Sequence, residues 1–144
     1  MLSCFDVARY FLALVDEDAG DSLTNLKLQK LVYYAQGFYL ALYDEPLFPE
    51  RIEAWMHGPV VPDLYHALKQ FGSEPVKLDW EVDPDRYTPE IMGLLDEVYS
   101  VYGQFSAVRL RNITHQEPPW KQTPNGHVIQ LDLMKSYFKT QITK

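Results

Sequence analysis

Residues 25–43 read NLKLQKLVYYAQGFYLALY, and this stretch decides the fold. Its apolar side chains recur at helical spacing, which predicts one long helix. They lie on two sides of that helix, so other elements must cover both sides. One stripe comprises Leu28, Leu31, Ala35, Phe38 and Leu42, with Val32 and Tyr39 beside it, and the second comprises Leu26, Tyr33, Gly37 and Leu40. We therefore expect the helix over Asn25–Tyr43 to lie at the centre of the molecule.

Three polar side chains interrupt this apolar helix: Gln29, Lys30 and Gln36. A buried polar group left without a hydrogen bond costs about 1–3 kcal/mol, so these groups need partners. Two interpretations remain open. Either the amides bond loop backbone and hold the fold together, or the three residues line a recognition surface.

Shorter helices are predicted before and after the central one. Their starts are marked by residues that cap or initiate a first helical turn. These starts are Ser3 with Asp6, Pro62 with Asp63, Thr88 with Pro89, and Ser106, and a last helix spans roughly 131–140.

Two stretches outside the helices show a weak alternation of apolar and polar residues, as short strands do. They are residues 51–57 and residues 76–78. Between them, Gly58–Pro62 is a stiff turn, because each proline fixes its own φ angle and restricts the residue before it. Two short strands are only marginally stable by themselves, so they must pack on the helices. We expect a mainly α single domain over residues 1–144, a compact bundle of about six helices around the central helix, with a short two-stranded β element.

Composition narrows the classes of function. The 144 residues are 47% hydrophobic and 14% aromatic, as in a folded domain, and the formal net charge is −7. That charge argues against binding to nucleic acid or to an anionic membrane. Cys4 is the only cysteine, and no apolar run approaches the roughly 18 residues of a membrane span. We expect a cytoplasmic protein.

An acidic stretch, residues 16–21, follows the first predicted helix and reads DEDAGD. Acids at the C-terminal end of a helix oppose its dipole. The stretch is interpreted either as a solvated turn or as a patch that meets a basic partner.

Catalytic and ligand-binding motifs are absent from the sequence. The four histidines lack metal-binding spacing, and no glycine-rich phosphate loop or GxSxG nucleophile motif occurs, so no metal or cofactor is expected. The nearest candidate for acid–base chemistry is Glu53 with Trp55 and His57, which strand spacing would place on one face. His115 could join such a site. Together with Trp120, it could instead close the core or anchor an interface.

Several blocks of the sequence, in order, resemble the Panacea domain, also called the SocA-like or GepA-like domain. Residues 28–37, LQKLVYYAQG, are similar to its signature LQKLLYYAQG. The further blocks are Pro46-Leu47-Phe48, Ile52-Glu53-Ala54-Trp55, Gly58-Pro59-Val60-Val61-Pro62-Asp63-Leu64-Tyr65, and Thr114-His115 followed by Pro119-Trp120. The resemblance covers nearly the whole chain, and His57 is the main departure, where an aromatic or basic residue is more usual.

The resemblance implies a function that composition alone does not. Members of this family act as antitoxins in two-gene toxin–antitoxin modules, usually by binding the toxin protein directly, and relatives occur near prophage genes. The member that gave the SocA name acts as a proteolytic adaptor that delivers its toxin to the ClpXP protease. No catalytic activity, metal or cofactor comes with the family. The alternatives to a toxin-binding antitoxin are therefore such an adaptor, or a small enzyme using Glu53, His57 or His115.

Two regions are candidates for contact with a partner. The first is the edge of the central helix with the Gly-Pro turn, which we expect to be exposed: Lys30, Tyr33, Tyr34, His57 and Pro59. The second is the aromatic turn of His115 and Trp120. The remaining motif residues are expected to be structural: Leu28, Gln29, Leu31, Gln36, Gly37, Glu53, Trp55, Gly58 and Pro62.

Overall fold

The computed structural model describes residues 1–78 and 80–142. Within these residues there are seven α-helices, one β-hairpin and three short 3-10 turns. The helices are α1 (Cys4–Leu14), α2 (Asn25–Tyr43), α3 (Pro62–Leu68), α4 (Pro89–Tyr102), α5 (Ala107–Thr114), α6 (Pro118–Lys121) and α7 (Leu131–Ile142). The 3-10 turns are η1 (Glu17–Ala19), η2 (Lys69–Phe71) and η3 (Pro84–Arg86). The mainly α fold is confirmed; the additional helix is α6, in the proline-rich turn before Trp120.

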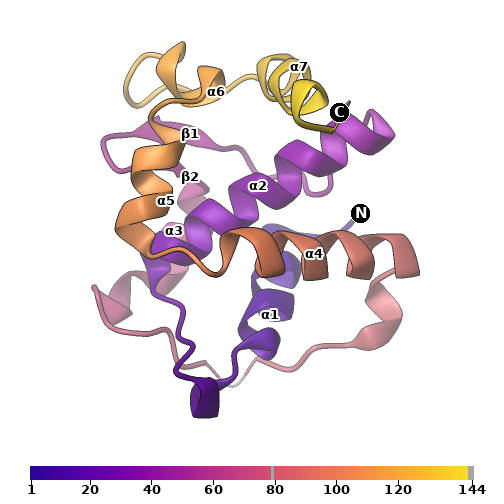
Figure 1. Cartoon of the computed structure of the whole chain (residues 1–144), viewed down its shortest axis with the longest axis vertical. Helices are drawn as coiled ribbons and strands as arrows, with labels where there is room; N and C mark the ends of the chain where they lie inside the picture. The colour runs from indigo at the N-terminus through magenta and orange to yellow at the C-terminus, as the bar shows by residue number, and fades with distance from the viewer. Residues whose placement is uncertain (79, 143–144) are drawn as a thin grey trace.

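Helix α2 crosses the middle of the molecule, as expected (Figure 1). The other helices and the hairpin pack around it, with α4 and α1 on one side and α7 near its C-terminal half. Every residue from Leu28 to Gly37 is buried. The apolar stripe stops short of the helix end, because Leu42 is 48% exposed.

Local sequence explains where the helices begin. The Ser3 hydroxyl accepts a hydrogen bond from the Asp6 amide, and the Asp6 carboxylate accepts one from the Ser3 amide, which is a capping box. Thr24, Thr88 and Ser106 cap α2, α4 and α5 through a single bond, in which the side-chain hydroxyl accepts from the backbone amide three residues later. The predicted helix starts are therefore confirmed.

The β-hairpin differs from the expected one. Strand β1 (Glu53–Trp55) pairs antiparallel with β2 (Gly58–Val60), and Trp55 lies opposite Gly58. The second strand thus falls in the stretch predicted to be a turn, and the predicted strand at residues 76–78 is wrong. On its other edge, β1 is bonded to residues 126–129. Strand β2 lies at the edge of the sheet, so Pro59 is tolerated although it lacks an N–H donor.

The core that α2 shares with α4 and α7 is aromatic. The Tyr34 ring stacks on Tyr102 with centroids 3.9 Å apart, and the buried Phe138 ring meets Tyr33 and Phe38 edge-on. A Cβ atom at Gly37 would overlap the Phe138 ring, so only glycine allows α7 to approach α2 this closely.

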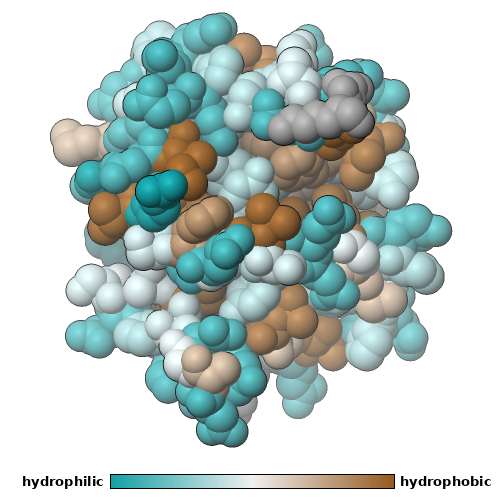
Figure 2. Space-filling view, in the orientation of Figure 1, coloured by the Kyte–Doolittle hydropathy of each residue, from teal (hydrophilic) through white to brown (hydrophobic). Residues whose placement is uncertain are grey.

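No helix in the described part of the chain has the length and apolar character needed to cross a bilayer. The face in Figure 2 is mostly hydrophilic, with separate hydrophobic patches instead of one continuous apolar surface. Singly scattered apolar side chains of this kind are normal on the surface of a folded protein.

Candidate functional site

The buried amide side chains of α2 form hydrogen bonds with the backbone of the surrounding loops. The Gln29 side chain accepts a hydrogen bond from the Val61 amide at 2.9 Å, and it donates to Asn25 at 2.9 Å. Gln36 accepts from the Leu47 amide at 2.7 Å and donates to the Phe48 carbonyl at 2.9 Å. Both amides therefore bond loop backbone, as the first interpretation expected.

Lys30 is a fully buried cation beneath the hairpin. Its Nζ donates to the Pro59 carbonyl at 3.1 Å. Burial lowers the pKa of Lys30 to about 7, and the nearby positive charge of Arg111 adds to this effect. Gly58 closes the space above it: its φ is 109°, and an added Cβ would lie 2.8 Å from Lys30 Cε and 2.9 Å from Thr114 Oγ1. The Gly-Pro segment therefore fits tightly over Lys30.

Glu117 is a buried carboxylic acid at the start of α6, and its hydrogen bonds connect α2 to α6. It accepts hydrogen bonds from the Tyr33 hydroxyl at 3.0 Å and from the Tyr34 hydroxyl at 2.8 Å. The Tyr137 hydroxyl of α7 is a third partner. Burial raises the pKa of Glu117 to about 7, against the opposing effect of these hydrogen bonds.

The sequence did not single out Glu117. An acid just before two prolines and a tryptophan resembles an ordinary helix start. Its role depends on tyrosines more than 80 residues earlier in the chain, and local pattern does not reveal that pairing.

The hairpin tip is fixed to α6 through two tryptophans. Trp120 Nε1 donates to the Trp55 carbonyl at 2.7 Å, and the His115 ring stacks on Trp120 with centroids 4.0 Å apart. Trp55 Nε1 in turn donates to Glu53 at 2.9 Å. The aromatic turn is thus held in one orientation beside the hairpin.

The structure places the predicted contact residues in two groups. The expectation that Lys30, Tyr33 and Tyr34 form an exposed edge is wrong, because all three side chains are fully buried. Pro59 is buried as well. The hairpin, α5, α6 and α7 cover this side of α2, and a helical pattern does not show how many neighbours a helix has.

The second group lies at the surface around the hairpin tip. His57 is exposed, His115 and Trp120 are half-buried, and Met56 is 73% exposed. Burial lowers the pKa of His115, and the positive charges of Arg111, Lys30 and His57 add to this effect, while a backbone hydrogen bond with Met56 opposes it. We call His57, His115, Trp120 and Met56 the hairpin-tip surface. Met56 was missed because a single methionine in a turn carries no pattern.

The geometry offers little for catalysis. Glu53 binds Arg51 Nε at 2.7 Å and Trp55 Nε1, so its carboxylate is held in structural bonds, and these hydrogen bonds lower its pKa despite burial. In residues 1–78 and 80–142, no group of three or more His, Cys, Asp or Glu side chains could hold a metal.

Comparison with known proteins agrees with this geometry. Residues 28–121 match the family described as "Antitoxin SocA-like, Panacea domain", so the chain belongs to the SocA-like Panacea family. The protein named Antitoxin SocA from Caulobacter vibrioides (strain NA1000 / CB15N) is 32% identical over 123 aligned residues. The match covers 77% of this chain and 65% of that relative, slightly less than two thirds of its length. No solved structure matches the chain. Homology to antitoxins favours a non-enzymatic role.

Proposed function

We propose that this protein is an antitoxin that holds a cognate toxin inactive by binding it directly. Membership of the SocA-like Panacea family is the observation that carries the proposal. The structure supports it because the family motifs build a rigid joint between α2, the hairpin and α6. No metal-binding cluster accompanies them among the residues described.

The hairpin-tip surface is the part of this joint that we propose contacts the toxin. Protein interfaces combine exposed apolar or aromatic anchors with a polar rim. Met56 and Trp120 supply the anchors, and His57 and His115 supply the rim. Trp120 is already fixed by its bond to the Trp55 carbonyl, so little freedom is lost on binding. Lys30, Tyr33, Tyr34 and Pro59 support this surface from beneath.

Co-expression with the product of the neighbouring gene tests the proposal. We expect that product to arrest growth alone, and to be harmless and co-purify when this chain is present. A neighbour that is not toxic, or that stays toxic and unbound, would show that the proposal is wrong. The partner's half-life must be unchanged in the same cells, because faster degradation would indicate a proteolytic adaptor instead.

A substitution at the hairpin tip tests the surface. We expect Met56→Asp to weaken toxin binding at least about tenfold, because it places a charge at an apolar anchor. The matched control is Val101→Asp, on α4, where the side chain is 43% exposed. Titration by isothermal calorimetry measures both variants. Equal affinities for the two would place the interface elsewhere.

A further inference from the structure

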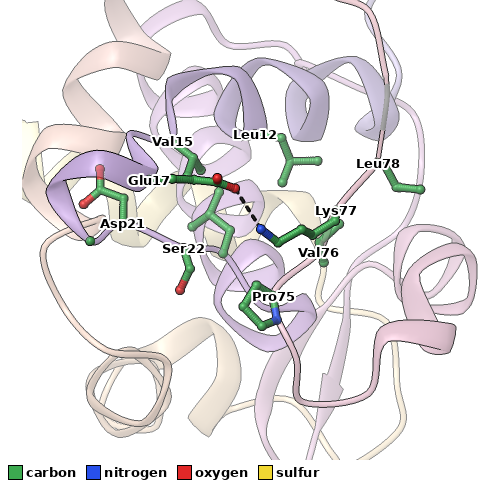
Figure 3. A pocket seen from close by; sticks show the side chains of 11 residues that line it. Leu12, Val15, Glu17, Asp21, Ser22, Pro75, Val76, Lys77 and Leu78 are labelled. Atoms are coloured by element: carbon green, nitrogen blue, oxygen red, sulfur yellow. Dashed lines mark hydrogen bonds and ion pairs between the residues drawn. The ribbon is translucent and has the colours of Figure 1, made fainter.

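A groove lies on the molecule next to the acidic stretch, away from the hairpin tip. It has a volume of about 680 Å³ and lies between the end of α1 with η1, residues 20–23, and residues 75–78 (Figure 3). Apolar side chains line it from both sides: Leu12, Val15, Leu23 and Val76. Glu17 and Lys77 reach toward each other across it, with Nζ and Oε1 2.9 Å apart. We call this cavity the acidic groove.

The backbone along the acidic groove begins a β-ladder that it does not continue. Thr24 and Pro75 form an antiparallel bridge, and the Val76 amide donates to the Leu23 carbonyl at 2.7 Å. In that register the Leu23 amide would donate to the Val76 carbonyl and the Leu78 amide to the Asp21 carbonyl, and neither bond forms between these described residues. Within the described ranges, the amides of Ser22, Lys77 and Leu78 have no hydrogen-bond partner. In a continued ladder, alternate amides face opposite edges, so of these three only the Leu78 amide would face Asp21 across the groove. A free backbone donor beside an open groove can receive an added strand.

The charge around the acidic groove favours a basic ligand. Glu17 and Asp21 line it, with Asp16 and Asp18 next to them in the chain, and all four are exposed. Lys77 is the single cation in the lining. Its ion pair with Glu17 has both side chains about two thirds exposed, so it is weak and can be exchanged.

We propose that the acidic groove binds an extended, basic segment of a protein partner as an added β-strand. The segment pairs with the free Leu78 amide, its apolar side chains enter the groove, and one of its Lys or Arg side chains replaces Lys77 at Glu17. This pairing accounts for the weak strand pattern of residues 76–78, because their partner strand comes from another chain. The proposal rests on the proposed function only in taking the toxin as the source of the segment.

A synthetic peptide tests the acidic groove without the toxin. We expect a peptide of alternating lysine and valine to produce saturable NMR shifts at the amides of Ser22, Leu23, Lys77 and Leu78, at concentrations up to the order of 1 mM. The same peptide with N-methylated backbone amides keeps its charge but cannot pair as a strand, so it should not bind. Absence of shifts at these amides, or equal binding of both peptides, would overturn the proposal.

Variants of the full chain test the electrostatic part. We expect Glu17→Lys to weaken peptide binding about fivefold or more, and Lys77→Ala to strengthen it, because Lys77 competes for Glu17. Glu97→Lys, an exposed charge reversal of the same size on α4, is the control and should leave binding within about twofold. An equal loss in Glu17→Lys and Glu97→Lys would show an unspecific effect of net charge and overturn the site.

The outcomes separate the two proposals. Absence of peptide binding by the unsubstituted chain, with toxin neutralisation intact, overturns the acidic groove alone. Peptide binding without any toxin neutralisation in co-expression overturns the antitoxin function and leaves the groove as a peptide site.

Discussion

At the scale of single residues, Lys30 and Glu117 bring ionisable groups into the interior beside α2, and burial moves the pKa of each to about 7 in opposite directions. The folded protein therefore favours the neutral form of both. Glu117 stabilises the fold fully below its unfolded pKa, and this contribution is lost as the pH rises through about 7. For Lys30 the contribution is present above its unfolded pKa and is lost as the pH falls toward about 7.

Replacing Glu117 tests its contribution to the pH dependence of the free energy of unfolding. Glu117→Gln removes the titration, so the variant should gain stability relative to wild type as the pH rises from about 5 to about 8. The expected gain is on the order of 2–3 kcal/mol. Urea unfolding at a series of pH values measures it. A difference between the two proteins that does not change with pH would contradict the assigned role of Glu117.

Gly58 gives a second test at this scale. Gly58→Ala should cost about 2–4 kcal/mol, because the φ of 109° is unfavourable for alanine and the new Cβ meets Lys30 and Thr114. Gly20→Ala is the matched control, since its φ is 85° but nothing lies within 4 Å. It should cost on the order of 1 kcal/mol, from backbone strain alone. Equal losses in denaturant unfolding would show that the fit over Lys30 is not tight.

Sequence reasoning at the residue scale succeeded where the pattern was local. Gln29 and Gln36 stood out as polar groups that need partners, and the structure provides loop backbone for both. Lys30, Tyr33 and Tyr34 were placed on an exposed edge because the pattern of one helix cannot show that α5, α6 and the hairpin cover it. Glu117 was missed because its tyrosine partners lie far away in the chain.

At the scale of elements, the contact of α7 with α2 depends on Gly37. Gly37→Ala should destabilise the fold by about 1–3 kcal/mol, because the Phe138 ring is buried among other rings and cannot move aside. Gly93→Ala is the control within a helix, since nothing lies near its added Cβ. It should stabilise α4 by about 0.5–1 kcal/mol. Thermal unfolding should therefore move in opposite directions for the two variants, and a shift in the same direction would contradict this packing.

Helices were easier to predict than strands in this chain. Capping residues and apolar spacing lie within a few residues of one another, so the helix starts could be read directly. The hairpin depends on pairing between segments, and residues 58–60 pair although Gly and Pro are poor strand formers. Residues 76–78 have the alternation of a strand and only one backbone bond to a neighbour.

At the scale of the whole molecule, the protein presents two separate surface features, the hairpin tip and the acidic groove. The hairpin tip gathers basic and aromatic groups, while the acidic groove carries exposed acids on a chain whose net charge is −7. Fold class and family could be predicted from the order of the motifs. The surfaces could not, because exposure depends on how distant segments pack together.

The central claim is that this chain inactivates a toxin by direct binding. The most direct measurement is a titration of the purified neighbouring gene product with the purified chain, following the toxin's activity and the complex in the same samples. We predict that activity falls to background as an equimolar complex forms, without any protease present. Full toxin activity with no complex at excess chain would contradict the claim.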